Sequence, residues 1–168
     1  KLHDDLFVAY KNSNYKNLCH NGSMFDHSPD NYTLTTHISS GSHFNHPLGS
    51  SLDNCSVLTI LIFGYSFNQP LGNSLDNCTK LTHIIFGSCF SQSLTSLFAN
   101  CRSLSHLSLG YCFDQRDGLP PSVRFLSMDC DNNYYVENLP DSIEELNLEC
   151  DFELELNNLP SSIKKITF

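Results

Sequence analysis

Positive charge is scarce in this sequence. The chain has 9 lysine and arginine residues against 18 aspartate and glutamate residues, which gives a formal net charge of −9. Nucleic-acid phosphates attract clustered cations, so this balance argues against nucleic acid as a partner. Long apolar runs are also lacking. The longest, from Val57 to Phe63, is interrupted by Thr59 and is far too short to span a bilayer, so no membrane-spanning segment is expected.

Catalytic motifs are absent from the sequence as well. It holds no nucleophile elbow, phosphate loop or zinc-protease motif, so we predict that the protein is not an enzyme and uses no cofactor. No charged-then-apolar leader precedes the rest, although the chain opens at Lys1 without a methionine, which fits processing or truncation. With 168 residues, of which 40% are hydrophobic and 16% charged, the chain fits one folded domain.

A short segment recurs at a fixed offset along the chain. Leu58–Gly64 (LTILIFG) returns as Leu81–Gly87 (LTHIIFG) and again as Leu104–Gly110 (LSHLSLG), with a weaker copy at 35–41. The period is about 23 residues in this part of the chain and shortens to about 20 residues downstream. Constant self-similarity of this kind is the signature of a repeat protein, here with seven units. The three shorter units begin at Val123, Ile143 and Ile163.

The pattern within each unit predicts a short strand. Its last apolar positions alternate with other residues, which places them on one face of a strand, and a strand so short stays dry only if copies stack in parallel. The return segments differ: Leu71, Leu75 and Cys78 have the spacing of a short helical turn, whereas the later units return through Leu-Pro-x-Ser. We therefore expect an α/β solenoid with a parallel sheet on its concave face, helical or extended turns on its convex side, and a change of bend near Gly118.

The two ends of the chain are expected to differ in organisation. Residues 1–34 do not repeat and are predicted to cap the solenoid, with a short helix suggested by Leu2, Leu6 and Tyr10, or to dock onto another protein. Residues 35–168 are predicted to form the solenoid.

With these repeats in view, the chain resembles the leucine-rich-repeat superfamily, and within it the FNIP or FGxxFN-type repeat proteins of giant viruses and social amoebae. The narrower resemblance depends on residues 63–70 (FGYSFNQP), with degenerate copies at 41–47, 86–91 and 109–114. The motif residues that carry it are Phe63, Gly64, Phe67, Asn68, Phe86, Gly87, Phe90, Gly110 and Phe113.

The resemblance has consequences for core and function. Phe44, Phe67, Phe90, Phe113 and Phe152 are expected to stack as an aromatic spine inside the coils, and the preceding glycines to permit a bend. Members of this family are thought to be protein-interaction modules, which implies a non-enzymatic scaffold. An intracellular protein is expected, in the cytoplasm of an infected or amoeboid host cell.

The residues between the apolar slots are predicted to line the concave face. Several of them are apolar where a solvated strand face is ordinarily polar, and contiguous exposed apolar residues mark interfaces, although scattered ones are normal. The predicted partner-binding residues are Ile60, Ile62, Tyr65, His83, Ile85, His106, Tyr111 and Phe125.

Three other interpretations of the function stay open at this stage. The concave face, or the bare strand edge that ends at Phe168, would serve a homodimer or a self-assembling structural protein. Ten acidic residues and no basic ones lie between Phe125 and Ile163, which favours a basic protein partner there. An extracellular recognition protein, with disulfides and glycans on four sequons, is the third alternative.

The cysteines and histidines invite other interpretations. Cys55, Cys78 and Cys101 share one repeat slot and Cys89 and Cys112 another, which indicates reduced core thiols rather than disulfides. His83 and His106 should lie on adjacent strands, but no third metal ligand is assured, and Asp129-x-Asp131-x-Asn133 lacks the glycine and glutamate of a calcium loop. No metal site is predicted.

Overall fold

The computed structural model describes residues 15–18, 33–115, 118–129, 139–149 and 159–168. The expected helix within residues 1–14 and the expected spine residue Phe152 lie outside this part of the chain. Among the described residues, no helix is long and apolar enough to cross a membrane.

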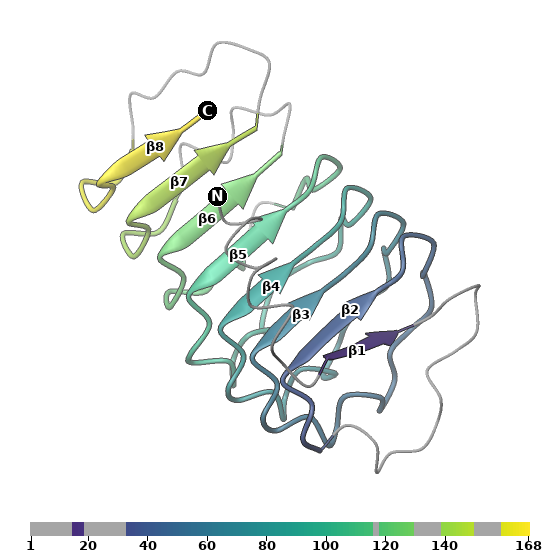
Figure 1. Cartoon of the computed structure of the whole chain (residues 1–168). Coiled ribbons are helices and arrows are strands. Elements are labelled where there is room, and N and C mark those ends of the chain that lie inside the picture. The colour runs from purple at the N-terminus through teal and green to yellow at the C-terminus, as the bar shows by residue number, and fades with distance from the viewer. Residues whose placement is uncertain (1–14, 19–32, 116–117, 130–138, 150–158) are drawn as a thin grey trace.

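The described strands form one parallel sheet that follows chain order from β1 to β8, each strand pairing with the next one along the chain (Figure 1). The described return segments pass behind the same sheet, so the chain is a stack of coils with a shared interior (Figure 1). The strands are β1 (Tyr15–Leu18), β2 (His37–Ser40), β3 (Ile60–Ile62), β4 (His83–Ile85), β5 (His106–Leu109), β6 (Phe125–Met128), β7 (Glu145–Leu148) and β8 (Lys165–Thr167).

The strand register reproduces the repeat found in the sequence. His37 pairs with Ile60, and Ile60 pairs with His83, one full period further along the chain each time. After β5 the period is shorter, because His106 pairs with Phe125 and Glu145 pairs with Lys165. The parallel solenoid is therefore confirmed. β1 adds a strand within the segment predicted as a cap.

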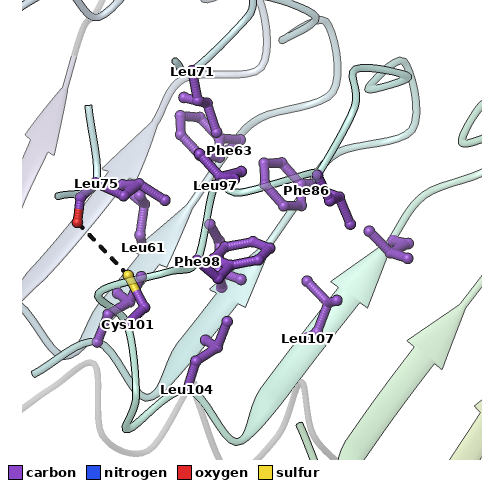
Figure 2. Close-up of a cluster of buried hydrophobic side chains, with 14 of the residues drawn as sticks. Leu61, Phe63, Leu71, Leu75, Phe86, Leu97, Phe98, Cys101, Leu104 and Leu107 are labelled. Atoms are coloured by element: carbon purple, nitrogen blue, oxygen red, sulfur yellow. Dashed lines mark hydrogen bonds between the residues drawn. The ribbon is translucent and has the colours of Figure 1, made fainter. Parts of the chain in front are cut away.

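Alternate side chains of each strand point into the coil interior. In β6, Leu126 and Met128 are buried while Phe125 and Ser127 are half-buried, and the other four-residue strands from β2 to β7 repeat the pattern. Figure 2 shows how leucines, phenylalanines and Cys101 from successive coils meet in this interior. Burying these apolar side chains stabilises each coil by about 1.5–3 kcal/mol per large residue, an upper estimate that conformational entropy largely offsets.

The return segments of the longer coils are chains of tight turns. Between Leu71 and Leu81, backbone N–H groups bond the carbonyl three residues earlier, as from Cys78 to Leu75 at 3.0 Å. Leu71, Leu75 and Cys78 are all buried, so the apolar side predicted for this segment is present. The described residues contain no helix, so the α/β assignment and the convexity of this side stay predictions.

The phenylalanines form the expected spine over the described coils. The rings of Phe44, Phe67, Phe90 and Phe113 stack in sequence with centroids 5.9, 6.1 and 6.3 Å apart and planes within 4° of parallel. Phe63 and Phe86 form a second column, 5.4 Å apart, which packs against the first. Stacked rings add stabilisation beyond their buried area, about 0.5–1.5 kcal/mol per pair.

A glycine stands shortly after β3 and after β4 because the coils lie too close together there for a Cβ atom. A Cβ atom on Gly64 would lie 2.2 Å from the carbonyl oxygen of Gly41, and one on Gly87 would lie 2.2 Å from that of Gly64. Real Cβ atoms do not approach backbone so closely. The motif glycine therefore permits close stacking of coils, in addition to any bend.

The asparagine of the motif bonds the coils to each other. Asn45 Oδ1 accepts hydrogen bonds from the backbone N–H of Asn68 at 2.9 Å and from Gln69 Nε2 at 3.0 Å. The motif asparagine thus accepts a backbone N–H of the next coil that the short strands leave unpaired, and the glutamine side chain adds a second hydrogen bond to the same oxygen.

One prediction about the cysteines is wrong. Cys55, Cys78 and Cys101 are buried core thiols as expected, but Cys89 is half-buried and Cys112 is exposed. Each of the latter directly precedes an inward-pointing phenylalanine, Phe90 or Phe113, so its own side chain points outward.

Candidate functional site

The candidate site is the face of the sheet that points away from the coil interior, called here the open face. It is built by the outward residues of β2 to β8, one ladder starting at His37 and the next at Ser39. Because the strands are parallel and in register, residues of one ladder lie side by side on neighbouring strands. The first ladder is His37, Ile60, His83, His106, Phe125, Glu145 and Lys165.

Three rings of this ladder form a continuous stack. The ring centroids of His83 and His106 are 3.9 Å apart with planes 13° from parallel, and those of His106 and Phe125 are 4.1 Å apart at 8°. The stack therefore spans β4, β5 and β6 as one continuous column of face-to-face rings.

Hydroxyl groups hold the histidine rings in place. Thr82 Oγ1 lies 3.0 Å from the carbonyl oxygen of Thr59 and 2.8 Å from Nδ1 of His83. Because that carbonyl also accepts the backbone N–H groups of Thr82 and His83, the hydroxyl bonds Nδ1 as donor or acceptor according to the tautomer of the ring. In either tautomer the contact fixes the orientation of the imidazole. Ser105 and His106 repeat the arrangement at 2.8 Å.

Burial keeps these imidazoles neutral. Desolvation, followed by repulsion from His106 and His37, lowers the pKa of His83 to about 4. Desolvation also lowers the pKa of His106 and that of His37 below the ordinary value of 6.5. At neutral pH the stack is therefore an uncharged aromatic surface rather than a cationic one.

The predicted apolar residues of the open face differ in exposure. Ile62 and Ile85, paired on β3 and β4, are half-buried, and Tyr65 and Tyr111, in the loops after β3 and β5, are 61% and 52% exposed. Ile60 is only 7% exposed, so its role in contacting a partner would be small.

Comparison with known proteins agrees with the repeat and with the solenoid fold. Residues 134–168 match the family model described as FNIP Repeat. The chain is also similar to the solved crystal structure of CroV588, described as a novel circular LRR protein, with 26% sequence identity and a TM-score of 0.57. The similarity covers 81% of this chain and 24% of that one.

Residues 134–168 therefore match an FNIP repeat, and the chain has an LRR-like solenoid fold. The chain spans about a quarter of the length of the solved protein that it matches, and a search of curated proteins gave no match. The structural similarity extends over most of the chain, whereas the family match falls on its last coils.

Charges along the last coils are paired across the stack. Glu144 accepts hydrogen bonds from Lys164 at 2.7 Å and from Arg124 at 3.3 Å, and these cations lower its pKa. Lys165 lies 3.4 Å from Glu145. The acidic run seen in the linear sequence is therefore partly neutralised by flanking cations that the shorter period brings beside it. Among the described residues, no group of three His, Cys, Asp or Glu gathers as a metal site.

Sequence reasoning missed two kinds of residue. The Thr-His and Ser-His pairs at 36–37, 82–83 and 105–106 recur in register, and this recurrence was the available signal for the ring-holding hydroxyls. It also missed Arg102, which lies beside two surface hollows where the coil length changes.

Proposed function

We propose that this protein is a non-enzymatic scaffold that binds another protein through the open face of its sheet, which we expect to be the concave face. The observation that carries the proposal is the neutral stack of His83, His106 and Phe125, with Ile62 and Ile85 in the adjoining ladder.

The chemistry of this face favours protein contact. Covering neutral rings and aliphatic side chains has little desolvation penalty, and because the sheet already holds these side chains rigid, they lose little conformational entropy when a partner binds. The Nε2 atom of His83, a donor or an acceptor according to the tautomer, adds a directed hydrogen-bond position within an otherwise apolar surface.

The test is a pair of matched double variants used as bait in extracts of candidate host cells. Ile62→Glu with Ile85→Glu places two carboxylates on the open face, and proteins retained by the unaltered chain should be lost. Asn73→Glu with Asn77→Glu adds the same charge at exposed positions of a return segment and should retain them. If both double variants capture the same proteins as the unaltered chain, the open face is not the binding surface.

A second candidate function is self-association. Phe168 is 73% exposed beside β8, and within the described residues β8 pairs only with β7, which favours contact between copies at this end. Sedimentation velocity over a range of protein concentrations tests it, because self-assembly raises the sedimentation coefficient with concentration and Phe168→Asp should suppress that rise. A sedimentation coefficient that stays at the monomer value at every concentration would rule out self-association.

We further propose a reducing compartment, the cytoplasm of an infected or amoeboid host cell. Support comes from the core thiols Cys55, Cys78 and Cys101, which are free and buried. Intact mass measured with and without reductant tests the proposal, since disulfides or glycans would shift the mass from that of the sequence.

A basic partner near the C-terminal third also stays a proposal, with Glu144 and Glu145 already paired.

A further inference from the structure

The coil length changes at one place in the stack. His83 pairs with His106, whereas His106 pairs with Phe125, so the return segment before β6 is four residues shorter than the one before it. A shorter return segment cannot cover its neighbour completely. The effect appears in one repeat slot: Leu52 and Leu75 are 1% and 0% exposed, whereas Phe98 is 7% exposed.

A hollow of about 390 Å³ lies at this step. Its apolar lining includes Leu94, Phe98, Leu119 and Pro120, and its volume falls within the range of about 300–1,000 Å³ that is typical of ligand pockets. One wall is fixed by Gly118, which has a φ of +97° and whose Cβ position would lie 2.5 Å from the carbonyl carbon of Leu94. The short return segment is thus pressed against Leu94 by a conformation that only glycine adopts without strain.

At the step, two exposed repeat positions differ in charge from the same positions on the preceding coils. The slot that holds Asp53 and Asp76 on the two preceding coils holds Ala99 at the corresponding position of this coil. Three positions further along, Ser56 and Thr79 are replaced by Arg102. A carboxylate is therefore lost and a guanidinium gained beside the apolar hollow.

Arg102 is available for a partner. It makes no ion pair with any residue in the described part of the chain, unlike Arg124, Lys164 and Lys165. It also lines a second hollow, of about 550 Å³, which shares Pro121 and Ser122 with the first.

The second hollow extends the first across the next coils. It includes Arg124 and Lys164, and the carboxylate between them, Glu144, already bonds both cations. With Arg102 and Asp141 counted, the lining carries three cations and two carboxylates, a local positive balance in a chain of net charge −9. Acidic groups would be attracted to this edge of the solenoid.

We propose that this step is a second binding site, separate from the open face, for an extended peptide segment of another protein. One apolar side chain of the peptide, of leucine or phenylalanine size, fills the hollow at Phe98 and Ala99. A neighbouring carboxylate of the peptide pairs with Arg102. A peptide fits better than a compact metabolite because the two hollows share Arg102, Pro121 and Ser122 and together cross more than one coil.

The experiment is a nuclear magnetic resonance titration of the ¹⁵N-labelled full chain with two short blocked peptides. One has the sequence Ser-Phe-Glu-Ser and the other, Ser-Phe-Gln-Ser, lacks only the charge. The first should shift the backbone amide signals of Ala99, Arg102, Gly118 and Leu119, and the second should bind on the order of tenfold more weakly.

Matched variants decide where the peptide sits. Arg102→Glu should weaken binding of the acidic peptide on the order of tenfold and abolish its advantage over the neutral one, whereas Lys80→Glu, on the preceding coil, should not. Ala99→Trp should fill the hollow and abolish binding, and Asp76→Trp, in the same slot one coil earlier, should leave it intact. The proposal is overturned if neither peptide shifts these signals at millimolar concentration, or if Arg102→Glu and Ala99→Trp bind unchanged. Because Ile62→Glu with Ile85→Glu should not affect this titration, failure here leaves the open-face proposal standing, and the reverse also holds.

Discussion

The side-chain oxygen of Asn68 accepts a hydrogen bond from the backbone N–H of Ser91, 2.9 Å away on the next coil. It accepts a second from Gln92 Nε2 at 2.8 Å. Each coil thereby supplies the acceptor that the following coil lacks once its short strand has ended. The asparagine of the motif is a stacking residue rather than a partner contact.

Asn68→Ala should destabilise the fold by about 1–3 kcal/mol, because it leaves the partly buried N–H of Ser91 without an acceptor. Urea unfolding followed by circular dichroism measures the change. Asn73→Ala, at an exposed position of the return segment, should alter the free energy of unfolding by no more than about 0.5 kcal/mol. Equal losses in both variants would contradict the stacking role.

Gly87→Ala should be more harmful than Gly49→Ala. The added methyl group at Gly87 would lie 2.2 Å from the carbonyl oxygen of Gly64, so two coils must separate, whereas nothing lies within 4 Å of the Cβ position at Gly49. At Gly49 only the strain of a φ of +54° remains, about 1 kcal/mol. Thermal unfolding of the two variants checks the ranking, and a smaller loss at Gly87 would show that the coils adjust.

Acidification should destabilise the protein through His83. Its pKa in the folded chain is about 4, below the ordinary 6.5, so on acidification the unfolded chain takes up a proton before the folded chain does. The stability is complete above about pH 6.5 and is lost as the pH falls toward about 4. His83→Phe keeps a ring in the stack and should reduce the loss of unfolding free energy between these pH values. The same substitution at exposed His43 is the control, and an unchanged pH profile in His83→Phe would contradict the assignment.

Alkylation should separate the cysteines by burial. Desolvation raises the pKa of Cys55 and Cys101 to about 11 and that of Cys78 to about 12, so little reactive thiolate forms at these core positions. The exposed Cys112 should react with iodoacetamide first. Peptide mapping by mass spectrometry after brief treatment of the folded chain identifies the modified residues. Early modification of Cys78 would show that the interior opens readily.

The solenoid could be predicted because its signal is repeated. A leucine at 58, 81 and 104 and a phenylalanine at 67 and 90 allow little besides coils in register, since each contact is specified by several copies. The ladder that contains His83 and His106 followed from the same register. The exposure of Cys112 did not, because outward and inward small residues look alike in composition and only the neighbouring Phe113 distinguishes them.

Features that depend on departures from the repeat were harder to predict. The orientation of the His83 ring depends on the hydroxyl of Thr82 and on a carbonyl one coil away, contacts that no linear motif contains. The hollow beside Phe98 depends on four residues that are missing from the next return segment. The partner residues of the open face stay predictions, since exposure at Tyr65 or Tyr111 shows access without showing what binds.

The column of Arg124, Glu144 and Lys164 alternates in sign from one coil to the next. Duplicating one of these coils would set like charges side by side, whereas duplicating two adjacent coils together would preserve the alternation. Because the pairs are exposed, each misplaced charge would cost no more than about 1 kcal/mol, so the column favours growth of this part of the array by two coils at a time without requiring it.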